Sequence, residues 1–289
     1  MTIKLGSIEA GGTKFILARA DESGQILQQV RIKTTSPKET LAACRDFFQK
    51  YPVDALAISS FGPVDINPHS PTSGYITKTP KPGWSMTDLK GTFEKALKIP
   101  VYLTSDVNGS CYGEYVARGR RDDQTYLYLT VGTGIGGGII QNGHFVGYAN
   151  HPEMGHMPVI PYPGDDYPGH CPFHGRCVEG MAAGPSLEGR TGIKGEDLPR
   201  DHQVFTYVHY YIAQCLFNAY LVARPDVMIV GGSVLGEDDL KSVREFFDKF
   251  NNNYVQTPAL EDLIVRPVVA DNGSATLGNF DLARQLLEK

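Results

Sequence analysis

The chain lacks long apolar runs, has few cysteines and carries no excess of positive charge. No run approaches the roughly 20 apolar residues of a transmembrane helix, and the early residues do not form a signal-peptide core. The five cysteines are an odd number and too scattered for a secreted disulfide scaffold. The net charge of −5 argues against nucleic acid or an anionic membrane surface as the main partner. We therefore expect a cytoplasmic protein that binds neither nucleic acid nor membrane.

Glycine, in contrast, is abundant. The 289 residues include 32 glycines, while 41% hydrophobic and 20% charged residues are the ordinary balance of a globular protein. At about 150 residues per domain, this length favours two domains. Because glycines cluster directly after predicted strands, the turns at these strand ends are the first candidates for a binding site.

Each half of the chain begins with strands and continues with alternating helices and strands. In the first half, strands are predicted at residues 3–8, 15–20, 26–32, 54–59 and 101–104, and helices at residues 36–50 and 106–118. In the second half, strands are predicted at residues 125–131, 145–148, 227–230 and 264–269, and helices at residues 201–223, 238–250 and from residue 274. This weak repeat predicts two similar α/β domains that face one another across a cleft.

Three glycine-rich turns follow predicted strands, at residues 11–14 (Gly-Gly-Thr-Lys), 132–138 and 231–233. Backbone amides in such turns can cradle phosphate oxygens, because no Cβ blocks the approach. Each turn alone is more simply a hairpin or a strand-to-helix connection, and none fits a Walker loop or a dinucleotide fingerprint. The three turns together indicate a nucleotide-binding site. Two phosphate loops from opposite domains are what a cleft-closing phosphotransferase needs.

Four metal-ligand residues lie close together in the second half: His156, Cys171, His174 and Cys177. Two thiolates and two imidazoles suit tetrahedral zinc, and Cys-x-x-His-x-x-Cys lets one short loop wrap the ion. Four protein ligands leave no open coordination position, so the zinc is expected to be structural. His170, next to Cys171, is a competing ligand, and chance clustering of thiols is the alternative.

The remaining cysteines and one further histidine are weaker candidates for metal ligands. Cys44, Cys111 and Cys215 lie in helical patterns and are most simply core residues. His151 precedes the cluster but is less favoured as a ligand than His170.

Two carboxylates are candidate functional groups. Asp106 follows an apolar strand and begins a predicted helix, which would keep it ionised and ready to accept a proton, although a simple N-cap is equally consistent with its position. Glu153 lies three residues before the first histidine of the zinc cluster, where it could accept a sugar hydroxyl or simply be solvated. Arg118, Arg120 and Arg121 are predicted to be a solvated helix end.

Taken together, these residues resemble the ROK family of bacterial sugar kinases and repressors, over essentially the whole chain. The turn at residues 11–14 matches the family's phosphate loop, and Asp106-Val107-Asn108 matches the segment with its catalytic aspartate. Glu153-Met154-Gly155-His156 matches its sugar-binding and zinc-anchoring motif. The likeness is closest to the zinc-containing fructokinases, through Glu9 in place of the usual aspartate, the loop at residues 79–84 (Thr-Pro-Lys-Pro-Gly-Trp) and residues 180–185.

The resemblance implies an actin/hexokinase-like (ribonuclease H-like) fold of duplicated α/β domains with an interdomain cleft. The implied domains are residues 1–118, completed by a C-terminal helix at 273–289, and residues 119–272 with the zinc-binding loop. Mg²⁺-ATP is the implied phosphoryl donor, Zn²⁺ a structural ion and a homodimer the implied assembly. His174 stands where family zinc sites more often have a third cysteine, and Glu9 is expected to act on magnesium through water.

The implied reaction is ATP-dependent phosphorylation of D-fructose to fructose 6-phosphate, with Asp106 as general base. Gly11, Asp106, Glu153 and His156 would contact the sugar. The implied ATP-binding residues are Gly12, Thr13, Lys14, Thr133, Gly134, Pro185, Gly231 and Gly232. A glucose or mannose kinase of the same family and a non-catalytic sugar sensor remain alternatives. A zinc-dependent hydrolase is disfavoured by the four ligands. The repressor branch has a DNA-binding region before the kinase core, and the early first strand favours a kinase.

Overall fold

The computed structural model describes residues 2–147 and 149–288, and it divides into two compact units. The N-terminal unit comprises Met1–Arg120, Gly147–His151 and Val268–Lys289. The C-terminal unit comprises Arg121–Val146 and Pro152–Pro267. Within the described residues, no helix is both long and apolar enough to span a membrane.

The N-terminal unit is built on a five-stranded sheet with strand order β3-β2-β1-β4-β7. The first three strands form an antiparallel meander, whereas β4 pairs parallel to β1 and β7 parallel to β4. The strands are β1 (Lys4–Ala10), β2 (Lys14–Asp21), β3 (Ile26–Lys33), β4 (Ala55–Ser60) and β7 (Val101–Ser105). A separate two-stranded sheet pairs β5 (Tyr75–Ile76) with β6 (Thr87–Asp88).

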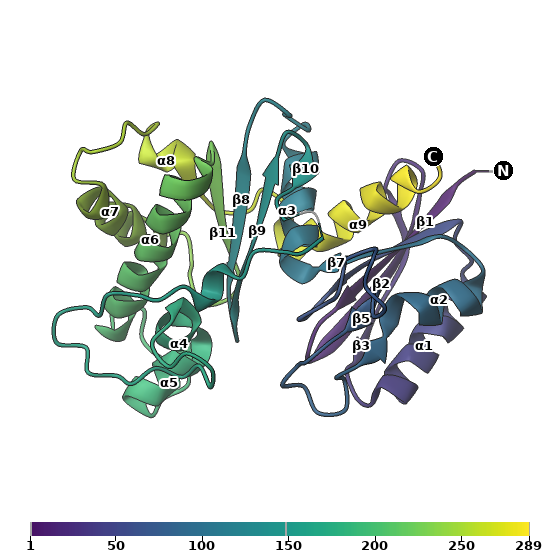
Figure 1. Ribbon diagram of the computed structural model, residues 1–289, viewed down its shortest axis with the longest axis horizontal. Coiled ribbons are helices and arrows are strands. Elements are labelled where there is room, and N and C mark those ends of the chain that lie inside the picture. Colours follow the sequence, from purple (N-terminus) through teal and green to yellow (C-terminus); the bar gives the residue numbers. More distant parts are fainter. Residues whose placement is uncertain (1, 148, 289) are drawn as a thin grey trace. The chain divides into compact units, whose positions relative to one another are not determined.

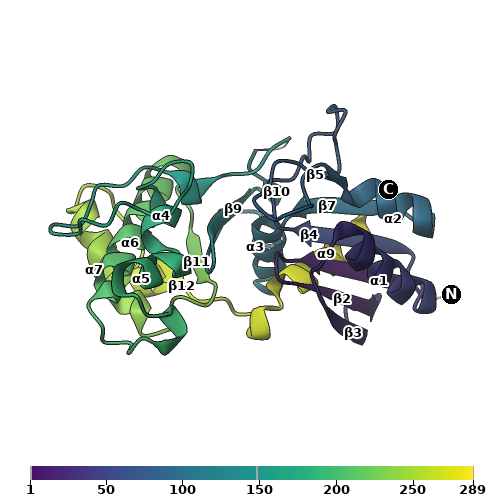
Figure 2. The ribbon, with the colours of Figure 1, turned by 90° about the horizontal axis from the view of Figure 1, so that it is seen from below.

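Helices cover both faces of this sheet (Figure 1 and Figure 2). On one face lie α1 (Pro37–Lys50), which begins at the predicted capping box with Ser36 as N-cap, and α2 (Leu89–Leu97). Apolar side chains of the strands, such as Phe15, pack there against Phe48 of α1 and Phe93 of α2. On the other face lie α3 (Asp106–Ala117) and α9 (Ser274–Gln285).

Glycines allow α3 and α9 to pack in backbone contact. A Cβ on Gly113 would lie 1.7 Å from the carbonyl oxygen of Ser274, and one on Gly278 would lie 2.4 Å from that of Gly109. The sequence-based helix over residues 106–118 is confirmed, and the glycines that weaken its propensity serve this packing.

The prediction of a solvated helix end is confirmed for Arg120 and Arg121, which are exposed, and is wrong for Arg118, which is half-buried. Arg120 forms an ion pair with Asp281 of α9 at 2.5 Å. Arg118 lies 3.4 Å from the fully buried carboxylate of Glu114. Arg120 therefore connects the end of α3 to α9, whereas Arg118 pairs with Glu114 of its own helix, and Arg121 makes a surface pair with Asp123.

The C-terminal unit has a second five-stranded sheet, with order β10-β9-β8-β11-β12. Its strands are β8 (Tyr126–Val131), β9 (Ile135–Gln141), β10 (His144–Phe145), β11 (Val227–Gly231) and β12 (Ile264–Val265). Strand order and direction repeat those of the first sheet, with three antiparallel strands followed by two parallel ones. The predicted internal repeat is confirmed at this level.

Two predicted strands are shorter than expected. The strand over residues 264–269 covers only Ile264–Val265, because the chain then passes to the N-terminal unit at Val268. The strand over residues 145–148 is replaced by His144–Phe145, and Tyr148 lies outside the described residues.

The core of the C-terminal unit lies between its sheet and the long helix α6 (Val204–Ala223), which packs on α7 (Asp239–Asn251) (Figure 1). Three short helices complete this unit: α4 (Val178–Ala182), α5 (Gly184–Thr191) and α8 (Leu260–Leu263). A 3₁₀ turn, η1 (Met154–His156), packs against β9.

Candidate functional site

Three parallel strands of the N-terminal unit end in register. Ala10 of β1 pairs with Ser60 of β4, and Ser60 pairs with Ser105 of β7. The next residues, Gly11 and Asp106, therefore leave the sheet at the same edge, two strand spacings or roughly 10 Å apart. This carboxyl-terminal edge is where α/β proteins place their ligands.

The first glycine turn is held in shape by Thr34, a buried residue just after β3. Gly11 N–H donates to the carbonyl oxygen of Lys14 at 3.0 Å. The Thr34 hydroxyl donates to the Gly11 carbonyl at 2.7 Å, and its N–H donates to the Thr13 carbonyl at 2.9 Å. A Cβ on Gly11 would lie 2.7 Å from the Lys14 carbonyl, whereas one on Gly12 would meet nothing within 4 Å. The turn is thus braced on its carbonyl side, with Thr13 and Lys14 exposed.

Asp106 is the first residue of α3 and is exposed, but it is not the N-cap. Ser105 has that role, since its side chain accepts a hydrogen bond from the N–H of Asn108 at 3.2 Å. One carboxylate oxygen of Asp106 accepts from the N–H of Val107 at 2.9 Å. The helix N-terminus favours the ionised carboxylate, which is the form a general base needs.

Glu9 faces α9 near the end of β1, where the hydroxyl of Thr276 donates to its carboxylate. Burial raises the pKa of Glu9 above its ordinary value, and the Thr276 hydrogen bond and the charges of Lys14 and Arg31 offset this only in part.

Trp84 anchors the loop at residues 79–84 to the same sheet edge. Its indole N–H donates to the Thr35 carbonyl at 2.9 Å, and the side chain is fully buried. Its ring packs on Phe15 and Phe61, with centroids 5.4 and 5.5 Å apart. Phe61 directly follows β4, the strand between β1 and β7, so the Trp84 ring contacts the middle of this edge.

The second glycine turn connects β8 to β9 in the C-terminal unit. Gly132 N–H donates to the Gly134 carbonyl at 2.9 Å, and the Gly132 carbonyl accepts from Gly184, the first residue of α5, at 2.7 Å. Glu179 of α4 accepts from the N–H of Ile135 at 3.0 Å and closes the turn from the other side. Sequence reasoning missed Glu179; its only signal is an acid two residues after the ligand Cys177.

The third glycine turn lies beside the second. A Cβ on Gly231 would lie 2.0 Å from the Tyr128 hydroxyl, and Gly232, with φ of +87°, packs on the Val131 carbonyl. Val234 N–H donates to that carbonyl at 3.0 Å, which brings this turn against the end of β8. The structure therefore gathers Thr133 and Gly134, Gly231 and Gly232, and Pro185 at the start of α5 around one turn.

Glu153 and His156 flank η1, which packs closely on β9. A Cβ on Gly155 would lie 1.8 Å from the Ile135 carbonyl, and one on Gly137 would lie 1.9 Å from Cε of Met154. These close contacts fix the segment, leaving the side chain of Glu153 exposed and that of His156 half-buried.

The predicted zinc ligands come together. The ligand atoms of His156, Cys171, His174 and Cys177 lie within 4.8 Å of one another, the single such group found among the described residues. His156 Nδ1 lies 3.7 Å from Sγ of both cysteines, and His174 Nδ1 lies 3.8 Å from Sγ of Cys171.

These distances fit a tetrahedral zinc ion. With Zn–S near 2.3 Å and Zn–N near 2.0 Å, a sulfur and a nitrogen ligand lie roughly 3.5 Å apart. The N–H of Gly180 donates to Sγ of Cys177 at 3.4 Å, a hydrogen bond that would orient the thiolate toward a zinc ion. His170 is exposed and outside the group, so the competing ligand set is not the one that the fold assembles.

The other three cysteines are core residues, as predicted. Cys44, Cys111 and Cys215 are at most 1% exposed. Burial raises the pKa of Cys44 and of Cys215 to about 12, so both remain thiols at neutral pH.

The predicted site residues thus form two groups. The N-terminal unit holds Glu9, the first glycine turn and Asp106, and the C-terminal unit holds the second and third glycine turns, Pro185, Glu153 and the zinc cluster. Each group is compact within its own unit.

Comparison with known proteins agrees with these features. The family model described as "ROK family" matches residues 5–286. The chain belongs to the ROK family. It is 49% identical to a fructokinase of Streptococcus mutans over 97% of both chains, and 47% identical to a fructokinase of Lactococcus lactis subsp. cremoris over 100% of both.

Solved structures agree on the fold of this ROK chain. A ROK hexokinase from Thermus thermophilus is 21% identical over 99% of both chains, with a TM-score of 0.79. A ROK glucokinase from Streptomyces griseus, in complex with glucose and AMPPNP, is 23% identical, covers 99% of this chain and 100% of its own, and has a TM-score of 0.74. The expected actin/hexokinase-like fold of duplicated α/β units is confirmed.

Proposed function

We propose that this ROK-family kinase is a fructokinase that transfers the γ-phosphoryl group of Mg²⁺-ATP to the 6-hydroxyl of D-fructose. The observation that carries the proposal is the shared sheet edge from which Gly11 and Asp106 depart. It puts the exposed carboxylate of Asp106 on the same sheet edge as the first glycine turn, whose amides can bind phosphate oxygens. The high identity to full-length proteins named fructokinase supports fructose as the sugar.

Asp106 acts as the general base. As the sugar oxygen attacks the γ-phosphorus, its proton passes to the Asp106 carboxylate, and the bond from phosphorus to the ADP oxygen breaks. Phosphoryl transfer passes through a loose transition state, so positioning and charge stabilisation do most of the catalysis. The braced turn with Gly11, Gly12, Thr13 and Lys14 is suited to both tasks, because it offers amides, a hydroxyl and an ammonium.

The C-terminal unit binds the nucleotide. Thr133 and Gly134 hold its phosphates, at a turn that adjoins the N-terminus of α5, where the helix dipole favours anions. Pro185, Gly231 and Gly232 contact the adenosine. Glu9 would hold Mg²⁺ through water, since its carboxylate already accepts a hydrogen bond from Thr276, and the ion would supply positive charge against the phosphates.

Gly11 and Asp106 contribute to sugar binding from the N-terminal unit, and Glu153 and His156 from the C-terminal unit. Because His156 points Nδ1 at both cysteine sulfurs, its Nε2 is the atom left for a sugar hydroxyl. The zinc ion is structural: it holds four side chains and so fixes the segment that carries Glu153. We further propose a homodimer that works in the cytoplasm, where ATP is supplied and zinc-binding thiols stay reduced.

Substrate preference tests the proposal directly. Purified protein is incubated with Mg²⁺-ATP and, separately, fructose, mannose, glucose and N-acetylmannosamine, and kcat/KM is measured by ADP release. We expect a clear preference for fructose. A preference for an aldose would replace the proposal with a glucose or mannose kinase. ATP binding without turnover of any sugar would point to a sensor. Light scattering of the same sample tests the dimer.

A further inference from the structure

A 14-residue segment, residues 157–170, separates the zinc ligand His156 from the ligand Cys171. We call it the strap. Apart from one bridge between Pro158 and Cys177, it has no helix or strand of its own. A flexible loop of this length costs closure entropy when its ends are brought together. Something other than secondary structure must therefore hold the strap.

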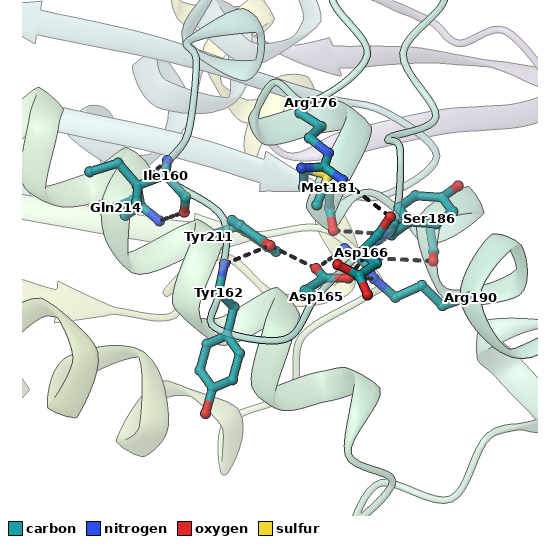
Figure 3. Close-up of polar contacts among 11 residues, drawn as sticks. Ile160, Tyr162, Asp165, Asp166, Arg176, Met181, Ser186, Arg190, Tyr211 and Gln214 are labelled. Atoms are coloured by element: carbon teal, nitrogen blue, oxygen red, sulfur yellow. Dashed lines mark hydrogen bonds and ion pairs between the residues drawn. The ribbon is translucent and has the colours of Figure 1, made fainter.

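Side chains of α6 hold the first half of the strap (Figure 3). Gln214 accepts from the N–H of Ile160 at 2.9 Å and donates to the carbonyl of the same residue at 2.8 Å. The hydroxyl of Tyr211 accepts from the N–H of Tyr162 at 3.0 Å. Both strap residues are thus bonded through their main chain, and the ring of Tyr162 also packs on Tyr210 of α6, with centroids 5.1 Å apart.

A buried ion pair holds the second half of the strap. Arg190 of α5 donates to both carboxylate oxygens of Asp165, at 3.1 and 2.8 Å, and the two side chains are only 7% and 3% exposed. The Tyr211 hydroxyl donates to the same carboxylate at 2.7 Å, and the Tyr167 ring lies 4.4 Å from the guanidinium. Burying two charges carries a desolvation penalty, so a buried ion pair is weak evidence that it stabilises the fold. The presence of this pair therefore calls for a role other than stability.

Each residue of this ion pair is connected to a part of the proposed site, Asp165 through its neighbour Asp166 and Arg190 through α5. Next to Asp165, the carbonyl of Asp166 accepts from Arg176 at 3.1 Å, and Arg176 lies in the ligand loop, one residue before Cys177 (Figure 3). At the other end, α5 begins at Gly184, which bonds to the second glycine turn. The ion pair therefore connects the zinc-ligand loop to the helix that contacts the nucleotide turn.

We propose that Asp165 and Arg190 are positioning residues that pre-organise the zinc ligands by clamping the strap. The inference rests on the proposed zinc site and goes beyond it, because it assigns the affinity and lifetime of zinc to residues that do not touch the ion. The clamped strap holds Cys171, which directly follows it, and, through the bond of Arg176 to Asp166, also the neighbouring ligand Cys177. When the clamp is opened, the ligands lose this order and zinc leaves faster.

The test is the rate of zinc transfer from the purified protein to a coloured chelator. Arg190→Lys keeps the charge but cannot donate to both oxygens or stack on Tyr167, and Asp165→Asn removes the anion. We expect each to release zinc up to about 10-fold faster, the lower end of the loss in metal affinity found when a residue bonded directly to a ligand is changed, because Asp165 and Arg190 act on the ligands through the strap. The double variant Asp165→Asn/Arg190→Met should be no worse than Arg190→Met alone, since the two residues act as a unit. If Arg190→Lys does not fold, Tyr211→Phe, which removes one hydroxyl, serves instead.

Arg200→Lys is the matched control. Arg200 also pairs with a buried aspartate, Asp239, and lies 4.1 Å from the Phe205 ring, but it bonds to the Val234 carbonyl and not to the strap. Because the Arg200 side chain is 51% exposed, we expect a smaller fall in melting temperature than for Arg190→Lys, with unchanged zinc release. Equal acceleration by both arginine variants, or release at the wild-type rate by Arg190→Lys, would overturn the clamp.

Kinetics provide the second readout. Arg190→Lys should raise KM for fructose more than KM for ATP, because the strap follows directly on the segment of Glu153 and His156. A general loss of stability would instead lower the amount of active enzyme without changing either KM. Zinc content of the wild-type protein is measured first. A wild-type chain without zinc would refute the zinc site and the clamp together, while a zinc-loaded protein that phosphorylates no sugar would refute only the fructokinase.

Discussion

The first residue of α3 shows how one position on a helix decides what a carboxylate can do. Ser105 takes over the capping hydrogen bond, so Asp106 does not need its side chain to hold the helix. We expect Asp106→Asn to lower kcat by about 10²–10⁴, the range for loss of a general base. Near-UV circular dichroism and zinc content should stay as in the wild type. A variant with a normal rate would remove Asp106 from this role.

Glu9 predicts a pH dependence of stability. Because burial raises its pKa in the folded protein, folding favours the protonated form, and stability is lost as pH rises from the ordinary glutamate pKa through the folded one. In Glu9→Gln this loss disappears. Melting temperatures at pH 5 and pH 8 should therefore differ less in the variant than in the wild type. A difference of the same size in both proteins would contradict a buried, titrating Glu9.

At the residue scale, the site residues that can be predicted from the sequence are those that form a local pattern in the chain. The four zinc ligands are recognisable because three of them lie within seven residues, but only the fold excludes His170. Glu179 and the pair of Asp165 with Arg190 were not predictable. Their partners lie 44 and 25 residues away in the sequence, so a single acid or arginine there has no pattern around it.

At the scale of elements, the crossing of α3 and α9 depends on glycine. In an ordinary helix, Gly→Ala stabilises by about 1 kcal/mol. At Gly113 the added Cβ would lie 1.7 Å from the Ser274 carbonyl. We therefore expect the opposite sign for Gly113→Ala, a loss of about 1–3 kcal/mol in the free energy of unfolding, as for other overpacked sites. Urea denaturation measures it, and a stabilised variant would show that the helices can separate at no cost.

Strand β12, shorter than the strand predicted over residues 264–269, shows why the end of a strand is hard to predict from sequence. Val268 and Val269 are apolar and β-branched, so residues 264–269 read as one strand. In the structure, the N–H groups of both valines donate to the buried carboxylate of Glu114, at 3.0 and 3.1 Å. A side chain from a distant helix replaces the strand partner, and no local pattern reveals such a replacement.

At the scale of the whole molecule, the repeated strand order is the feature that the sequence predicts best. Both sheets follow the same pattern of apolar runs and a glycine turn after the first strand, and this periodicity is visible in one dimension. The short excursion of Gly147–His151 into the N-terminal unit is not, because its five residues have neither periodicity nor a motif.

Zinc removal tests whether the zinc site supports sugar binding separately from nucleotide binding. The proposed zinc ligands all lie in the C-terminal unit, and His156 is three residues from Glu153. We expect about one zinc per chain by metal analysis. Chelation should raise KM for fructose, since the segment of Glu153 loosens, and should leave nucleotide binding measurable by a fluorescent ATP analogue. Active protein that contains no metal would make the cluster incidental.

The last helix of the N-terminal unit has a consequence for how the chain is made. Asn279 of α9 bonds to the Ser7 hydroxyl, the Ile8 carbonyl and the Ser59 hydroxyl, all on strands that leave the ribosome early. The entire C-terminal unit is synthesised between these strands and their covering helix. During translation, the sheet face that α3 and α9 share is therefore covered only in part, by α3, until α9 emerges. Folding of the N-terminal unit is completed only after the C-terminal unit has been synthesised. A chain whose translation stops before α9 therefore lacks the helix on which its first strands pack.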